Sequence, residues 1–212
     1  MKSTGSWDNG LVIISVFLIG LFLMTACTGE EVRSLWGRDG PSEEYLRILE
    51  RWTDHGTVYQ DFEAKIHVSG TYKSSVFREA FVREYSRGYH LSPIEEAEML
   101  AMQETMAEKN IEFLLAVSAP NKRENHLDAR DSAWRMYLEN EYIGRLKPKE
   151  IRRIRPSKRT ARSDGYYPYI SPWAEVYQVR FESQVPPPPS GELRLVITGI
   201  LGAVHLVYQL GD

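Results

Sequence analysis

The chain has 212 residues, with 26 Lys and Arg against 29 Asp and Glu, and its formal net charge is −3. This near balance lacks the basic excess of nucleic-acid-binding domains, so we expect no nucleic-acid partner. The single cysteine, Cys27, precedes the part of the chain that is expected to fold. Disulfides, thiol catalysis and cysteine-ligated metals are therefore excluded from that part.

An apolar run near the N-terminus, Leu11–Met24, contains no charged residue. As a helix with a rise of about 1.5 Å per residue it would be about 21 Å long, which is short of the roughly 30 Å hydrocarbon core of a bilayer. Its length suits the apolar region of a secretory signal peptide, and the small residues Thr25 and Ala26 suit a cleavage site. We therefore predict a signal peptide over residues 1–26.

The sequence Met24-Thr25-Ala26-Cys27 resembles the lipobox of bacterial lipoproteins. The resemblance implies that Cys27 becomes the first residue of the mature protein, with a diacylglycerol on its sulfur and an acyl chain on its nitrogen that hold the protein to the membrane. Thr28, in place of Asp, resembles the class sorted to the outer membrane, facing the periplasm, in bacteria with two membranes. The alternatives are an ordinary signal peptide with a free Cys27, and an uncleaved membrane anchor.

Residues 27–41 are polar and contain glycine, which predicts a tether with an r.m.s. reach of about 20 Å. Residues 42–212 predict a single globular domain with helices over 43–54, 74–87 and 93–109. The second helix is expected to stop at Gly88. The third has the clearest start, because Ser92 and Glu95 form a capping-box pair around Pro93. The apolar residues expected to face inward from it are Met99, Leu100, Met102 and Met106.

Seven segments of the domain carry a strand pattern. Alternation predicts one strand within 58–72, with Phe62, Ala64, Ile66 and Val68 on its buried face, and the apolar run 111–117 predicts a central strand. The other segments are 132–140, 150–155, 173–182, 192–198 and 203–210, of which the last two resemble a hairpin. In 132–140, the alternation places Trp134, Met136 and Leu138 inward. In 173–182, it places Trp173, Tyr177, Val179 and Phe181 on one face.

These elements predict a mainly β, α+β fold: a roughly seven-stranded antiparallel β-sandwich with an inserted helical hairpin and an N-terminal helix. The sandwich is expected to consist mostly of residues 110–212, joined by the strand 58–68. Its strand spacing resembles that of immunoglobulin-like sandwich domains, without their paired cysteines.

A search for catalytic patterns finds no HExxH, GxSxG or SxxK motif and no glycine-rich phosphate loop. We therefore predict no enzyme activity, no cofactor and no metal site. A cleft that brings together two or more of His67, His126 and His205 with carboxylates would favour an enzyme instead.

Two segments stand out as possible contact surfaces. The first is a basic segment whose only acid is Glu150, and it comprises Arg145, Lys147, Lys149, Arg152, Arg153, Arg155, Lys158, Arg159 and Arg162. It suits an acidic partner or anionic headgroups, or alternatively a solvated edge strand whose charges discourage edge-to-edge pairing. The second is an aromatic segment with Tyr166, Tyr167, Tyr169 and Trp173, which suits either a contact site or the capping of one end of the core.

The function predicted from these patterns is that of a membrane-anchored, non-catalytic interaction or assembly module in the periplasm, with another envelope protein as its partner. One alternative is a lipid or glycan carrier that uses the helical hairpin as a lid. A second, weaker alternative is an enzyme of a type that the sequence does not identify.

Overall fold

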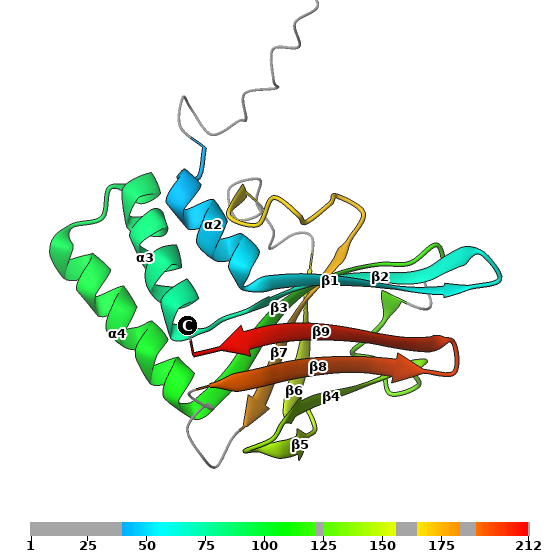
Figure 1. Ribbon diagram of the computed structural model, residues 1–212. Coiled ribbons are helices and arrows are strands. Elements are labelled where there is room, and N and C mark those ends of the chain that lie inside the picture. Colours follow the sequence, from blue (N-terminus) through cyan, green and yellow to red (C-terminus); the bar gives the residue numbers. More distant parts are fainter. Residues whose placement is uncertain (1–39, 122–124, 156–164, 183–189, 212) are drawn as a thin grey trace, which may run out of the picture. The chain divides into compact units, whose positions relative to one another are not determined.

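A computed structural model describes residues 40–121, 125–155, 165–182 and 190–211 (Figure 1). The predicted signal peptide, Cys27 and most of the tether lie outside these residues, as do Lys158, Arg159 and Arg162 of the basic segment. Among the described residues, no helix is long and apolar enough to cross a bilayer.

The predicted mainly β, sandwich-like α+β fold is confirmed. The described residues form two antiparallel sheets that face each other, with a helical hairpin inserted between two strands. The five-stranded sheet has the order β1 (Thr53–Gln60), β2 (Glu63–Tyr72), β3 (Asn110–Ser118), β7 (Glu175–Glu182) and β6 (Glu150–Ile154). The four-stranded sheet has the order β5 (Gly144–Leu146), β4 (Trp134–Asn140), β8 (Gly191–Gly199) and β9 (Gly202–Leu210).

The single strand predicted within 58–72 is wrong, because this segment contains the turn of the β1–β2 hairpin. The chain reverses at Asp61 and Phe62, whose φ angles are 51° and 65°. Two consecutive residues with positive φ form the usual two-residue hairpin turn, but that turn normally contains Asn or Gly. Phe62, expected on the buried face, is therefore fully exposed, whereas Ile66 and Val68 are buried as predicted.

The helices form at the predicted places with altered ends. The N-terminal helix α2 (Glu43–Arg51) stops before residue 54 because Thr53 already begins β1. Helix α3 (Ser75–Tyr89) continues through Gly88 and ends at His90, which is left-handed with a φ of 54°. Gly88 instead permits close packing, because a Cβ there would lie 2.8 Å from the Tyr166 hydroxyl.

Helix α4 (Pro93–Lys109) has the predicted bounds and capping box, but its predicted burial is wrong. None of its residues is buried, and Met102 and Met106 are exposed because α4 packs mainly against α3 at the periphery. The core lies between the sheets instead. It includes the tilted ring pairs of Tyr72 with Phe113 and Tyr208, at centroid distances of 5.3 and 5.9 Å.

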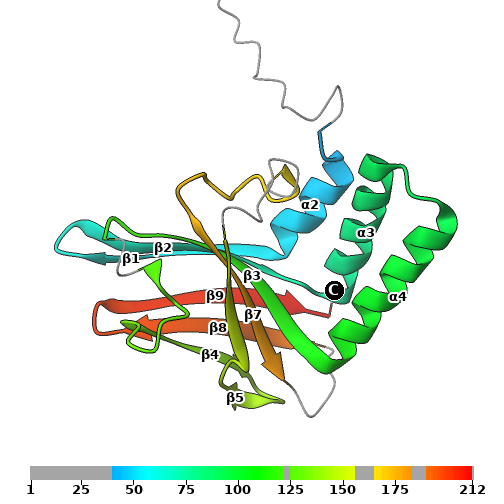
Figure 2. The same cartoon turned by 180° about the vertical axis from the view of Figure 1, so that it is seen from behind.

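The two sheets meet along one side, where β1 lies beside β9. Gly56 allows this close approach, since a Cβ there would lie 2.5 Å from Val204 Cγ1. The Asp54 carboxylate accepts a hydrogen bond of 2.7 Å from the Val207 backbone N–H across the same corner. At the other side of the sandwich β5 and β6 are the outermost strands, and the chain crosses between them through Lys147–Lys149 (Figure 2).

Candidate functional site: an open seam between the sheets

A surface cleft of about 470 Å³ lies where β4 and β6 approach each other at this second side of the sandwich. We call it the seam. Its lining residues come from the loop before β4, from β4 itself, and from the β5–β6 crossing with the start of β6; they are Leu127, Asp128, Ala129, Trp134, Arg135, Met136, Tyr137, Lys147, Pro148 and Ile151. The volume is in the range of ligand-binding pockets.

The floor of the seam is apolar. Leu127, Trp134 and Met136 are each at most 5% exposed, and Ile151 and Pro148 are half-buried. The alternation of β4 places Trp134 and Met136 on its inner face, as the sequence predicts. Both residues were expected only as core residues. No local sequence pattern indicates that the first half of β4 lacks a paired strand on one side.

Two strand edges border the seam. Among the described strands, β6 pairs with β7 alone, and β5 pairs with β4 only at Leu138–Asn140. The first half of β4, Trp134–Tyr137, therefore has β8 as its sole partner among the described residues. Backbone N–H and C=O groups at such edges are not used by the sheet and remain available to an added strand.

The basic segment runs along this side, and much of its charge is compensated. Arg145 bonds the Glu139 carboxylate of β4 at 2.7 Å, Lys149 bonds Glu182 at 2.5 Å, and Arg153 bonds Glu175 at 2.8 Å. These acids lie on neighbouring strands, so a count along the basic segment does not include them. Lys147 and Arg155 are exposed and form no ion pair with any described residue.

The aromatic segment divides into two parts. Tyr166 and Tyr167 are at most 9% exposed, and the Tyr45 hydroxyl of α2 donates to the Tyr166 carbonyl at 2.8 Å. The hydroxyl of the half-buried Tyr169 lies 2.6 Å from Thr71 Oγ1, and burial raises its pKa. These tyrosines therefore close the outer face of the five-stranded sheet.

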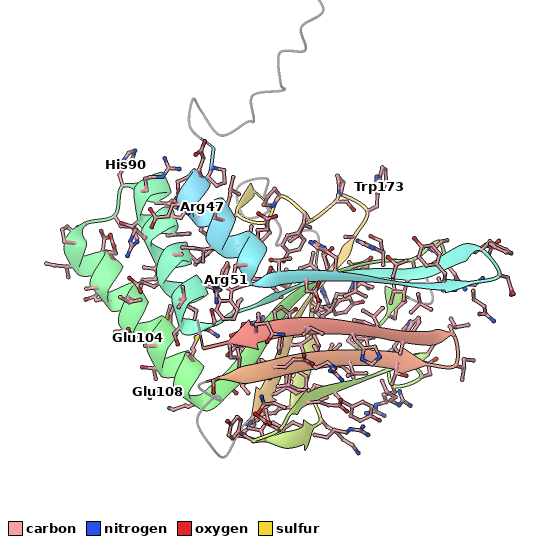
Figure 3. The ribbon with its side chains drawn as sticks, in the orientation of Figure 1. Arg47, Arg51, His90, Glu104, Glu108 and Trp173 are labelled. Carbon is pink, nitrogen blue, oxygen red and sulfur yellow. The ribbon has the colours of Figure 1, made fainter. Side chains whose placement is uncertain are left out.

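Trp173 is 86% exposed and projects outward from the loop before β7 (Figure 3). The prediction that Trp173 shares one face with Tyr177 is wrong, because β7 begins only at Glu175; Tyr177 is fully buried. Of the aromatic segment, Trp173 has the side chain that is most available for contact.

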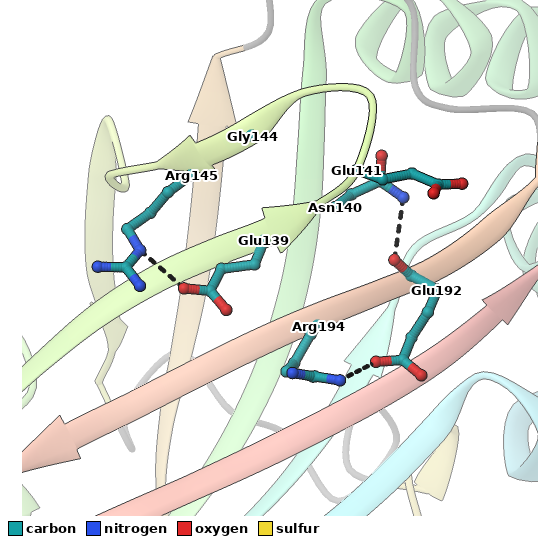
Figure 4. Close-up of a pocket in the computed structure, with 7 residues that line it drawn as sticks. All are labelled: Glu139, Asn140, Glu141, Gly144, Arg145, Glu192 and Arg194. Atoms are coloured by element: carbon teal, nitrogen blue, oxygen red, sulfur yellow. Dashed lines mark hydrogen bonds and ion pairs between the residues drawn. The ribbon is translucent and has the colours of Figure 1, made fainter.

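A second cleft of about 470 Å³ lies at the β4–β5 turn and the start of β8 (Figure 4). Its lining is polar, and four of its five charged side chains pair within the cleft: Arg145 with Glu139, and Arg194 with Glu192. The fifth, Glu141, forms no ion pair with a described residue. Asn140 Nδ2 donates to the Glu192 carbonyl at 2.9 Å. Because most of its charged groups already pair with one another and its lining has no apolar side chain, this cleft has less to offer a partner than the seam.

The three histidines considered for an enzyme site, His67, His126 and His205, lie on different elements of the described structure. His67 stacks on His55 across the β1–β2 hairpin, with ring centroids 6.4 Å apart. Ser69 Oγ lies 2.8 Å from His55 Nδ1, and burial together with His55 lowers the pKa of His67. His205 lies on the four-stranded sheet and His126 in the loop before β4. Within the described ranges, no three His, Cys, Asp or Glu residues are grouped to hold a metal ion.

Comparison of the chain with known protein families, with curated proteins and with solved structures finds no match. A proposal on function therefore rests on the seam and on the N-terminal sequence.

Proposed function

We propose that the protein is a lipid-anchored envelope protein that binds another envelope protein at the seam and catalyses no reaction itself. The observation that carries the proposal is an apolar-floored cleft bordered by two strand edges that no described strand covers. Its rim carries Arg135 and Lys147, which form no ion pair with any described residue, beside one acid, Asp128.

The N-terminal sequence supports the location. Met24–Cys27 is similar to a lipobox, and acylation of Cys27 would hold the chain at a membrane. Each buried CH₂ contributes about 0.8 kcal/mol, and two or more chains give stable anchoring. A tether with a reach of about 20 Å keeps the domain close to the bilayer, where an envelope partner is available.

The chemistry of the seam supports binding of a protein segment. The half-buried Pro148 and Ile151 provide apolar area that a partner can cover, worth about 25 cal/mol per Å² removed from water, above a floor of almost fully buried Trp134 and Met136. Arg135 and Lys147 are exposed at the rim. An apolar centre with a polar, charged rim is the usual arrangement of a protein–protein contact.

The carrier alternative has less support, because the space between the helical hairpin and the sheet is filled. Phe77 and Arg78 of α3 are 1% and 3% exposed, and Arg78 forms a buried ion pair with Glu112 of β3. A hairpin that opened as a lid would have to break this pair.

Site-specific photo-crosslinking in the native host tests the proposal. Tyr137 lines the seam, and benzoylphenylalanine at this position keeps the aromatic ring of tyrosine and extends it by a photoreactive benzoyl group. The matched control is Tyr59, which is 69% exposed on β1 and lies away from the seam. We expect one discrete protein adduct from position 137 and none of that mass from position 59. Absence of any adduct at 137, or equal adducts at both positions, would overturn the proposal.

A further inference from the structure

We propose that the partner is bound at the seam as an added β-strand: an extended, acidic segment pairs with the free edge of β6. This inference rests on the proposed function and specifies the partner segment and the way in which it binds.

The hydrogen-bond register identifies which backbone groups of β6 are free. Lys73 donates its N–H to the Glu112 carbonyl at 2.9 Å, so the backbone of Glu112 faces β2. Directions alternate along an antiparallel strand, so the neighbouring Ile111 and Phe113 face β7, where they are opposite Phe181 and Val179.

The alternation continues across β7. Since Phe181 and Val179 face β3, the backbones of Arg180 and Gln178 face β6, and the Arg180 carbonyl indeed accepts a bond of 2.8 Å from the Lys149 N–H. Glu150 and Arg152 lie opposite Arg180 and Gln178, so the backbones of Glu150 and Arg152 form the hydrogen bonds with β7. The N–H and C=O groups of Ile151 and Arg153 therefore point to the outer edge of β6, where no described strand pairs with them.

An extended chain is the partner that satisfies this pattern of free groups. Donors and acceptors two residues apart along a strand match the backbone of another strand, which is the basis of recognition by strand addition. Alternate side chains of the added strand would then face the apolar floor at Trp134 and Met136. Strand β6 has five residues, which sets the length of the pairing segment.

Side-chain hydrogen bonds to β7 hold β6 in place on the side opposite its outer edge. Arg152 donates to Gln178 of β7, Gln178 donates to Glu112 of β3, and Arg78 of α3 donates to the same carboxylate at 3.1 Å. This chain of bonds fixes β6 before a partner arrives, which lowers the ordering cost of binding.

Charge indicates an acidic partner segment. Lys147 and Arg155 flank β6 and form no ion pair within the described residues, and Arg152 bonds the neutral Gln178 rather than an acid. Arg135 bonds backbone carbonyls of Ser132 and Trp134. Acidic side chains on an added strand would meet these cations, and a basic segment would be repelled.

Proline substitution tests the inference, because proline removes an N–H and leaves most of an edge strand intact. Arg153→Pro removes a free N–H of β6 without removing a backbone hydrogen bond to β7. Arg153→Ala is the matched control, because both variants lose the side-chain ion pair with Glu175 and only Arg153→Pro loses the N–H. We expect the adduct at position 137 to fall roughly tenfold with Arg153→Pro, as for the loss of one backbone hydrogen bond, and less than about twofold relative to wild type with Arg153→Ala.

Ile151→Pro and Ile151→Ala form a second pair, in which both variants lose the contact of the Ile151 side chain with the seam and only the first loses the N–H. We expect Ile151→Pro to give roughly tenfold less adduct than Ile151→Ala, and circular dichroism selects the variants that fold. If the wild-type adduct forms and persists in the folded proline variants, strand addition is overturned while the proposed function stands. If the wild type forms no adduct, the proposed function is overturned as well.

Discussion

Arg78 on α3 and Glu112 on β3 form an ion pair of 3.1 Å, although their side chains are only 3% and 2% exposed. Lys73 bonds the other oxygen of the same carboxylate at 3.0 Å. The pair attaches the helical hairpin to the centre of the five-stranded sheet. A buried charge without its partner lowers the free energy of unfolding, so loss of this pair should have a measurable effect on stability.

Arg78→Met is expected to lower the free energy of unfolding by about 3 kcal/mol, since it leaves the Glu112 carboxylate partly uncompensated in a buried place. The measurement is urea unfolding followed by circular dichroism. The matched control is Arg83→Met, whose ion pair with Glu79 is more than half exposed, and its effect is expected to stay below about 1 kcal/mol. Equal effects of the two substitutions would contradict the role of the buried pair.

The same carboxylate predicts a pH dependence of stability. Burial alone would raise the pKa of Glu112, but Lys73, Gln178 and Arg78 outweigh it and lower the pKa from 4.5 to about 2. A lowered pKa in the folded state adds stability that is complete above the unfolded value and lost as the pH falls towards 2. Wild type should therefore lose about 3 kcal/mol more than Glu112→Gln between pH 5 and pH 2. Parallel stability curves for the two proteins would contradict this account.

Phe62→Gly is expected to stabilise the protein by about 1 kcal/mol. Phe62 has a φ of 65°, which is unfavourable for a residue with a Cβ, and its fully exposed ring contributes no packing. Tyr59→Gly in the neighbouring strand is the control; it should destabilise, because Tyr59 is not among the residues with positive φ. Thermal unfolding of the two variants measures the contrast, and a loss of stability in both would refute the argument.

Cys27→Ala tests the anchor. If acylation of Cys27 holds the protein, this substitution should move it from the membrane fraction to the soluble fraction, because the apolar run Leu11–Met24 is short for a bilayer span. Cell fractionation with a high-salt wash measures the distribution. A variant that stays with the membranes at high salt would indicate an uncleaved helix.

Local signals in the sequence were sufficient where a structure depends on adjacent residues. The start of α4 follows from Ser92, Pro93 and Glu95, and the exposed and buried faces of β4 follow from its alternation. The turn at Asp61 and Phe62 was missed because its residues are not those that favour positive φ.

The candidate site depends on contacts between distant segments. The acids that compensate the basic segment, Glu139, Glu175 and Glu182, lie on β4 and β7 and reach it only through strand pairing. The seam exists because β5 pairs with just one end of β4. The alternation of apolar and polar residues along a strand carries no information about how much of that strand is paired. The sequence alone therefore identified the basic segment and its two interpretations. The strand register shows which of its described residues form ion pairs with acids on neighbouring strands and which form none.

The most direct test of the central claim, that an acidic partner segment occupies the seam, is the yield of the in-cell adduct at position 137 after charge reversal. Lys147→Glu places a negative charge on the seam rim, and Arg47→Glu makes the same change on an exposed residue of α2, away from the seam (Figure 3). We predict that Lys147→Glu lowers the yield roughly fivefold, equivalent to about 1 kcal/mol, and that Arg47→Glu leaves it unchanged. An unchanged or higher yield with Lys147→Glu would contradict the claim.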